Sequence, residues 1–274
     1  MLATILIWLY TIFTIYMVGW MTSQLLFHIL KIQPLSQLSF PLICLVGMAV
    51  MSFIASTFSL FLPLGMIAQI TVLSITIFAF ILRIKYSPLS FRQLVKQCFS
   101  TRIPVTLLIL IAGLATLILA IQIPNNYDTG LYHAQAIRWI ETYPAIPGLA
   151  NLHSRLGYNS SWLVLQALYS FAFIGGNSYH LMTSVLFLIA ILFFGQGINR
   201  FWNGKRNASD WFNLLSFPLL LYMFSDQVSS PGNDTPVALI SWIIISGWIH
   251  YFEKDTTNND LHPVILTLLS VYAI

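Results

Sequence analysis

Long apolar runs separated by short polar segments dominate this chain. About 20 consecutive apolar residues are needed to cross a bilayer as a helix, and several of the runs approach or exceed that length. They are continuous rather than alternating, which disfavours a transmembrane β-barrel. The expected spans cover about 2–30, 40–62, 64–82, 103–122, 180–198, 211–225 and 237–252. The pattern therefore predicts an all-α fold, a polytopic transmembrane helical bundle.

Two polar segments interrupt this pattern, one after the fourth apolar run and one after the sixth. Residues 123–160 form the longest interruption, and residues 225–236 form the second. Within the first, residues 129–142 contain no proline and are typical of a helix, with Asp128 as its N-cap. We expect both segments to be loops at the same membrane surface, the first of them carrying surface-lying helices.

Composition agrees with a lipid-embedded protein. The 274 residues are 58% hydrophobic and 7% charged, whereas a soluble domain carries roughly 25% charged residues. The expected partner is therefore membrane lipid. The net charge of +4 is not arranged as a basic face interleaved with aromatic side chains, so nucleic acid is not an expected partner.

Clusters of basic residues predict the orientation. They fall in residues 83–102 and 200–206, which the positive-inside rule assigns to the cytoplasm. A polybasic lipid-binding helix over 83–102 is an open alternative on the same leaflet. Counting the spans from these clusters predicts an extracytoplasmic N-terminus and extracytoplasmic loops, in the inner (cytoplasmic) membrane of a cell.

Residues 158–175 are apolar enough for a short span, but a crossing there would put the second basic cluster outside. We therefore expect a helix that lies along the outer surface or dips into it. Trp162, Gln166 and Tyr169 suit such an interfacial position.

Acidic residues in the two outer loops are the first candidates for chemistry. These are Asp128 in one loop, and Asp234 and Asp226 in the other. An acid at a membrane boundary can hold a divalent cation that neutralises phosphate, or accept a proton from an attacking hydroxyl. The alternative is that Asp128 and Asp234 only cap helices.

A second set of candidates follows Asp128 within the first loop: Tyr132, His133, Arg138 and Trp139. Together they could hold a phosphate and stack on a sugar, and His153 and Arg155 repeat the pattern. The alternative is an aromatic belt with a snorkelling arginine. The chain has no HExxH, P-loop or GxSxG motif, and no ionisable residue at the middle of a span, which disfavours an ion-coupled transporter.

The order of these segments resembles the catalytic core of the GT-C superfamily of multi-pass glycosyltransferases. An outward span leads to a loop with an acid near the membrane (NNYDTGLYH), then to an aromatic-rich helix (YNSSWLVLQALYSFAFIGG). An inward span to a basic turn (GINRFWNGKR), an outward span and the loop SSPGNDTP follow. The resemblance covers about residues 103–252, and residues 127–159 also resemble a group of bacterial envelope proteins with this layout.

The resemblance implies transfer of a sugar from a polyprenyl-phosphate-linked donor at the outer face of the cytoplasmic membrane, in cell-envelope polysaccharide assembly. Asp128 is then the catalytic residue, as base or metal ligand, and Asp234 takes the second-loop role. Arg138 and Arg155 hold the lipid-linked phosphate. Tyr132, His133 and Trp139 contact the sugar or the acceptor. A divalent cation, Mg or Mn, is the implied cofactor, with Asp128 and Asp234 as its candidate ligands.

A non-catalytic role in polysaccharide assembly or transport is the alternative function. Three regions are expected in either case. Residues 1–102 form an N-terminal three-span scaffold with a basic cytoplasmic loop, and residues 103–252 form the GT-C-like core. Residues 253–274 contain a cytoplasmic loop and the start of a further span, whose shortness suggests a truncated chain.

Overall fold

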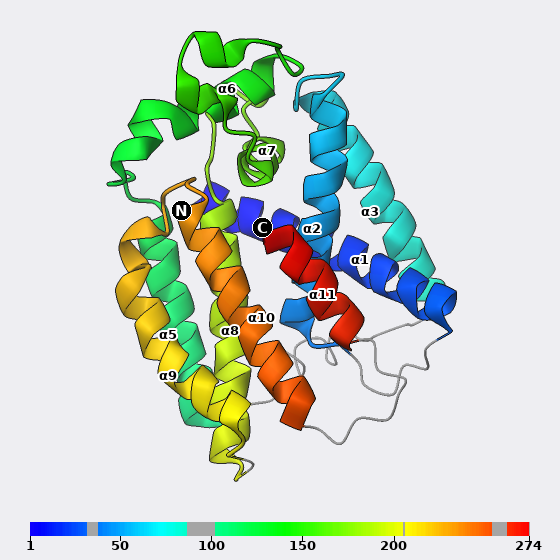
Figure 1. Ribbon diagram of the computed structural model, residues 1–274, viewed down its shortest axis with the longest axis vertical. Helices are drawn as coiled ribbons and strands as arrows, with labels where there is room; N and C mark the ends of the chain where they lie inside the picture. The colour runs from blue at the N-terminus through cyan, green and yellow to red at the C-terminus, as the bar shows by residue number, and fades with distance from the viewer. Residues whose placement is uncertain (32–37, 87–101, 205, 254–261, 274) are drawn as a thin grey trace.

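The protein is a bundle of helices (Figure 1). A computed structural model describes residues 1–31, 38–86, 102–204, 206–253 and 262–273, and these contain helices and no strand. The longer helices are α1 (Leu2–Leu30), α2 (Phe40–Ser59), α3 (Met66–Tyr86), α5 (Ile103–Ala120), α8 (Met182–Trp202), α9 (Ala208–Met223), α10 (Asp234–Glu253) and α11 (His262–Ala273). The shorter ones are η1 (Thr129–His133), α6 (Ala134–Thr142), η2 (Leu149–Asn151), η3 (Ser154–Gly157), α7 (Ser161–Leu168) and η4 (Ser225–Gln227).

Among the described residues, 6 helices are long and apolar enough to cross a membrane: α1, α2, α3, α5, α8 and α10. The chain is therefore a multi-pass helical membrane protein, as the apolar pattern predicts. The expected span at 211–225 corresponds to α9, which has 16 residues and contains Pro218. At about 1.5 Å per residue α9 is about 24 Å long, somewhat shorter than the ~30 Å hydrocarbon core. It packs between α8 and α10.

Helices α3 and α5 present apolar side chains on the outside of the bundle. Ile70 and Ile77 of α3 are exposed, as are Leu107, Ile111 and Leu114 of α5. Without charged neighbours these surfaces are suited to contact with lipid chains.

Helices α1 and α2 pack with their backbones in contact. A Cβ atom added at Gly47 would lie 1.7 Å from the carbonyl oxygen of Ile15, and one added at Gly19 would lie 1.9 Å from that of Ile43. Glycines allow membrane helices to approach this closely. Helix α1 crosses obliquely behind the other helices (Figure 1), and this glycine contact joins it to α2.

Both polar loops lie at one end of the bundle, which we call the loop end (Figure 1). The α2–α3 turn is there too, because the Leu64 backbone N–H donates to the Ile140 carbonyl of α6 at 3.0 Å. The start of α1 lies near this end, since the Trp8 indole N–H donates to Ser184 of α8 at 2.8 Å. At the opposite end the Arg102 backbone N–H donates to Asn199 at 3.0 Å.

The helix expected over 158–175 is short and lies inside the protein. Helix α7 covers only Ser161–Leu168, so it does not cross the membrane, and Trp162–Leu168 are all buried. The predicted interfacial position is therefore wrong for Trp162, Gln166 and Tyr169, whose side chains face neighbouring helices. The Tyr169 hydroxyl lies 2.9 Å from the Thr14 hydroxyl of α1.

The end of α7 is satisfied by a polar side chain from a membrane span. The Gln69 amide of α3 donates to the Leu168 carbonyl, and its oxygen accepts from the Tyr10 hydroxyl at 2.8 Å. A helix end buried at membrane depth needs such a partner, because no water is there to replace it.

Replacing Gln69 with leucine is expected to destabilise the protein, because two buried polar groups lose their partner. The free energy of unfolding should fall by about 1–3 kcal/mol, measured by thermal unfolding in detergent. Ser74→Ala, which removes an exposed hydroxyl bonded only to its own helix, is the control and should change little.

Arg83, the first charge of the basic cluster 83–102, does not belong to a loop. It lies in α3, buried, with its guanidinium 5.1 Å from the Tyr16 ring centre and 4.9 Å from that of Trp20. The Tyr16 hydroxyl also accepts a hydrogen bond from Nη2 at 2.8 Å. Aromatic faces thus accommodate this cation inside the bundle. The rest of the predicted cytoplasmic loop, residues 87–101, lies outside the described residues.

The second basic cluster contains an ion pair. Arg200 of α8 contacts Asp210 of α9 at 2.8 Å, and the Asp210 side chain is buried. The guanidinium of Arg206 lies 5.7 Å from the Phe201 ring centre, while Lys205 and the tail at 254–261 are outside the described residues. The pair fixes the α8–α9 turn at the end opposite the polar loops.

Candidate functional site

Two hydrogen bonds join the two polar loops, and a third joins the second loop to α8. The Thr129 and Ser230 hydroxyls are 3.2 Å apart, and the Asn126 amide donates to Gln227 at 2.9 Å. Thr183, at the start of α8, donates to the Ser230 carbonyl at 2.7 Å. The expected convergence of the loops thus holds in the structure.

Asp128 precedes the helix at 129–142 but does not cap it with its side chain. Its carboxylate instead accepts a hydrogen bond from Arg155 at 2.5 Å, in an ion pair whose two side chains are 38% and 37% exposed. The Asn126 side chain accepts from the Asp128 backbone N–H at 2.8 Å and so orients the loop. The Asp128 carboxylate therefore forms an ion pair rather than a helix cap.

The ring of Tyr132 packs against this ion pair. The Arg155 guanidinium lies 5.3 Å from its ring centre, and the Tyr158 ring meets it edge-on at 5.9 Å. Burial raises the pKa of Tyr132, and Asp128 raises it further while Arg155 lowers it. Tyr132 is thus a neutral aromatic surface beneath a charged pair. Sequence reasoning did not identify Tyr158, because a single loop tyrosine carries no signal of its own.

A π-helical turn, η1, places His133 relative to Asp128. The Ala134 N–H donates to the Thr129 carbonyl, five residues back rather than the four of an α-helix. The wider turn brings position 133 closer to the face of position 128 than an α-helix does. Such turns are rare and frequent at functional sites.

His133 is buried, 2% exposed, and neither ring nitrogen has a hydrogen-bond partner among the described residues. Burial lowers its pKa, whereas Asp128 and Asp234 raise it and Arg155 lowers it. Gly232 lies against the ring, since a Cβ added there would be 3.0 Å from Cε1. The second loop therefore covers an imidazole without partners.

The two acids of the second loop differ in position. Asp234 is the first residue of α10 and is exposed, and its charge acts on both Tyr132 and His133. Asp226 is also exposed and accepts a hydrogen bond from Gln227 at 3.1 Å. Asp234 is thus the second-loop acid that the structure brings towards the Asp128 site.

Arg138 belongs to a different cluster. It contacts Glu141 of the same helix at 3.4 Å, and Glu141 also accepts from the Ser178 hydroxyl at 2.5 Å. The Ser178 oxygen lies 3.0 Å from His180 Nε2, and burial lowers the pKa of His180. This cluster fastens the segment before α8 to α6. Sequence reasoning missed it because Ser178 is 37 residues from Glu141.

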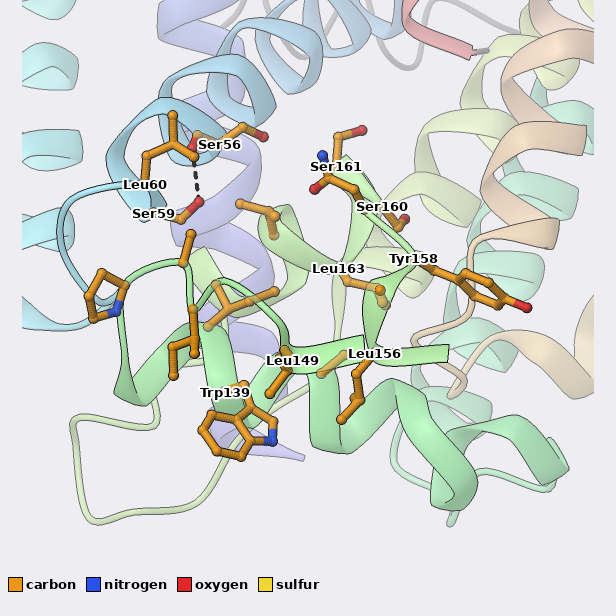
Figure 2. Close-up of a pocket in the computed structure, with 18 of the residues that line it drawn as sticks. Ser56, Ser59, Leu60, Trp139, Leu149, Leu156, Tyr158, Ser160, Ser161 and Leu163 are labelled. Atoms are coloured by element: carbon orange, nitrogen blue, oxygen red, sulfur yellow. Dashed lines mark hydrogen bonds between the residues drawn. The ribbon is translucent and has the colours of Figure 1, made fainter. Parts of the chain in front are cut away.

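Trp139 lines a cavity of about 540 Å³ between the end of α2 and the first loop. Figure 2 shows Ser56, Ser59 and Leu60 of α2 on one side and Ser160, Ser161 and Leu163 on the other, with Tyr158 pointing away. None of the described residues that line it carries a charge. Aromatic rings and hydroxyl groups around an apolar cavity are suited to a ligand of mixed polarity.

A smaller cavity of about 270 Å³ lies on the other side of residues 158–161. Its wall includes Asn233 and Val237 near the start of α10 and Tyr272 of α11. The segment 158–161 therefore separates two cavities beside the ion pair of Asp128.

The metal site implied by the resemblance would depend on the two carboxylates of Asp128 and Asp234. Within the described part of the chain no three His, Cys, Asp or Glu side chains are grouped to hold a metal ion. Asp128 already has Arg155 as its counter-charge. A Mg or Mn ion held by Asp128 and Asp234 would therefore need waters and the phosphate oxygens of a substrate as its other ligands.

Comparison with known families gives one match. The family model described as "Domain of unknown function (DUF8201)" matches residues 1–274. No curated protein and no solved structure matches the chain.

Proposed function

The chain belongs to the DUF8201 family, and we propose that it is a membrane glycosyltransferase that uses a polyprenyl-phosphate-linked sugar. The reaction takes place at the loop end, which we assign to the outer face of the cytoplasmic membrane because the described basic residues Lys85, Arg102 and Arg200 lie at the opposite ends of their helices. The product belongs to cell-envelope polysaccharide or another envelope glycan.

The observation that carries this proposal is a charged site beside an uncharged cavity. The Arg155–Asp128 pair adjoins Tyr158, which also lines the larger cavity. The rim of that cavity includes Phe53 and Leu60 of α2, which are 73% and 59% exposed at the bundle surface. A molecule with an anionic head and an apolar chain fits both parts, and a sugar phosphate on a lipid has this chemistry.

In this proposal Arg155 binds the donor phosphate through its planar guanidinium. The hydroxyl oxygen of the acceptor forms a bond to the anomeric carbon of the sugar, while its O–H bond breaks and the proton passes to a base or to water at the site. The bond from that carbon to the phosphate oxygen breaks, and its electron pair leaves with the lipid phosphate. Asp128 accepts a hydrogen bond from the attacking hydroxyl and orients it, since its half-exposed carboxylate still faces solvent. Trp139, which lines the cavity, gives the sugar an aromatic surface.

Asp128→Asn tests the assignment. The protein in nanodiscs is given undecaprenyl-phosphate-linked glucose, mannose or arabinose with a solubilised envelope glycan fraction, and released undecaprenyl phosphate is measured. The amide keeps the shape but not the charge, so we expect release to fall at least about 100-fold.

Asp226→Asn is the matched control, because its side chain still accepts from Gln227, and it should retain wild-type release. Equal release from Asp128→Asn and the wild type would remove Asp128 from the mechanism. Tight binding of undecaprenyl phosphate by a wild type that transfers none of these sugars would favour the non-catalytic assembly role.

A further inference from the structure

His133 has a buried imidazole without hydrogen bonds. Buried polar groups nearly always have a partner, and an exception calls for an explanation. The nearest hydroxyls do not supply one, because Thr129 is bonded to Ser230, which also receives the Gly232 N–H at 3.3 Å. Both imidazole nitrogens are therefore left unpaired among the described residues.

The surroundings of His133 favour a neutral ring that can gain a proton. Burial keeps the imidazole neutral, whereas two carboxylates stabilise the imidazolium once it forms. The charged and titratable groups that act on it are Asp128, Asp234 and Arg155, with Tyr132 against the ring and His180 from the segment before α8. A neutral base between two carboxylates is suited to general base catalysis near neutral pH.

Asp128 is less suited to keep the proton. Its Oδ1 atom already accepts a hydrogen bond from Arg155, so this oxygen is not free to take the proton of the attacking hydroxyl. It can orient a hydroxyl, but the proton needs another destination.

We propose that His133 is that destination, the general base of the site; this rests on the proposed function. The acceptor O–H bond breaks and an N–H bond forms on the imidazole, while the hydroxyl oxygen bonds to the anomeric carbon. The electron pair of the broken carbon–oxygen bond leaves on the lipid phosphate. The imidazolium, stabilised by Asp128 and Asp234, then returns the proton to water.

Gly232 provides the route to the ring. Its backbone lies against Cε1 with no side chain between, so a small displacement of residues 229–233 admits a hydroxyl group. Any larger residue at position 232 would press on the imidazole.

The test is His133→Ala with free imidazole added, using the transfer assay above. Release should fall about 100- to 10,000-fold and should recover in part with imidazole, which fits the space of the lost ring. His180→Ala, which removes a partly buried histidine of the loop end, should keep wild-type release and should not respond to imidazole. Undecaprenyl phosphate binding should be unchanged in His133→Ala, which separates loss of chemistry from loss of folding.

The pH profile gives a second readout. Only neutral His133 can accept the proton, so wild-type release should decline as pH falls through its pKa, which lies below the ordinary 6.5. In His133→Gln this acid limb should disappear from the residual activity. Recovery of His133→Ala with imidazole, together with loss of the acid limb in His133→Gln, supports the general base. Unchanged release in both variants overturns the general base and leaves the transferase proposal standing. A wild type that transfers no sugar overturns both.

Discussion

Gly47→Ala should lower the thermal unfolding midpoint of the protein by about 6–12 °C, corresponding to about 3 kcal/mol. The added methyl group would lie 1.7 Å from the Ile15 carbonyl oxygen, and because that neighbour is backbone, no side chain can rotate away. The α1–α2 contact must open. The midpoint can be measured by intrinsic fluorescence in detergent or nanodiscs.

Gly113→Ala on α5 is the matched control. Its new methyl group would meet only the Leu188 side chain, at 3.7 Å, which is ordinary contact. Alanine is also favoured over glycine inside a helix by roughly 1 kcal/mol, so this variant should be unchanged or slightly more stable. An equal fall of the unfolding midpoint in both variants would show that stability does not depend on the close approach of α1 and α2 at Gly47.

Arg155→Leu should weaken binding of undecaprenyl phosphate in nanodiscs by about 10- to 100-fold. The loss removes the guanidinium expected to hold the phosphate and leaves Asp128 to repel it. Partial exposure of the pair keeps the effect below that of a fully buried charge. Arg155→Lys should bind at an intermediate level, because an ammonium keeps the charge but not the planar fork.

Arg138→Leu is the control that distinguishes the two candidate phosphate ligands. Both arginines were expected from the sequence to hold the phosphate, but Arg138 contacts Glu141. Its replacement should leave phosphate binding within about twofold, since its ion-pair partner among the described residues is Glu141 and not Asp128. If Arg138→Leu weakened binding more than Arg155→Leu, the phosphate site would have to move to the Glu141 cluster.

Much of the fold follows from local patterns. The apolar runs predict the membrane helices, and the helix at 129–142 is found as η1 followed by α6. The burial of α7 could not be predicted, because an apolar residue in a membrane protein can face lipid or protein with equal ease. The burial of Arg83 could not be predicted either, because its partners come from another helix. Its charge was expected in a loop, whereas the rings of Tyr16 and Trp20 accommodate it inside the bundle.

The residue types of the candidate site could be recognised in the sequence, but which side chains contact each other could not. Asp128, Tyr132, His133, Arg155 and Asp234 all stood out as polar or aromatic groups in loops. That Asp128 bonds Arg155, 27 residues later, depends on how the loop folds back. The cover over the His133 imidazole depends on Gly232, a residue without chemistry of its own.

The hydrogen bonds between the two loops have a consequence for biogenesis. Asn126 and Thr129 bond to residues 101 positions further along the chain, so the first loop emerges well before its counterpart is synthesised. Until α8 and α9 are inserted, the imidazole of His133 lacks its cover. In a nascent chain stalled before residue 225, His133 should therefore react with a histidine-modifying reagent that it resists in the finished protein, where it is buried.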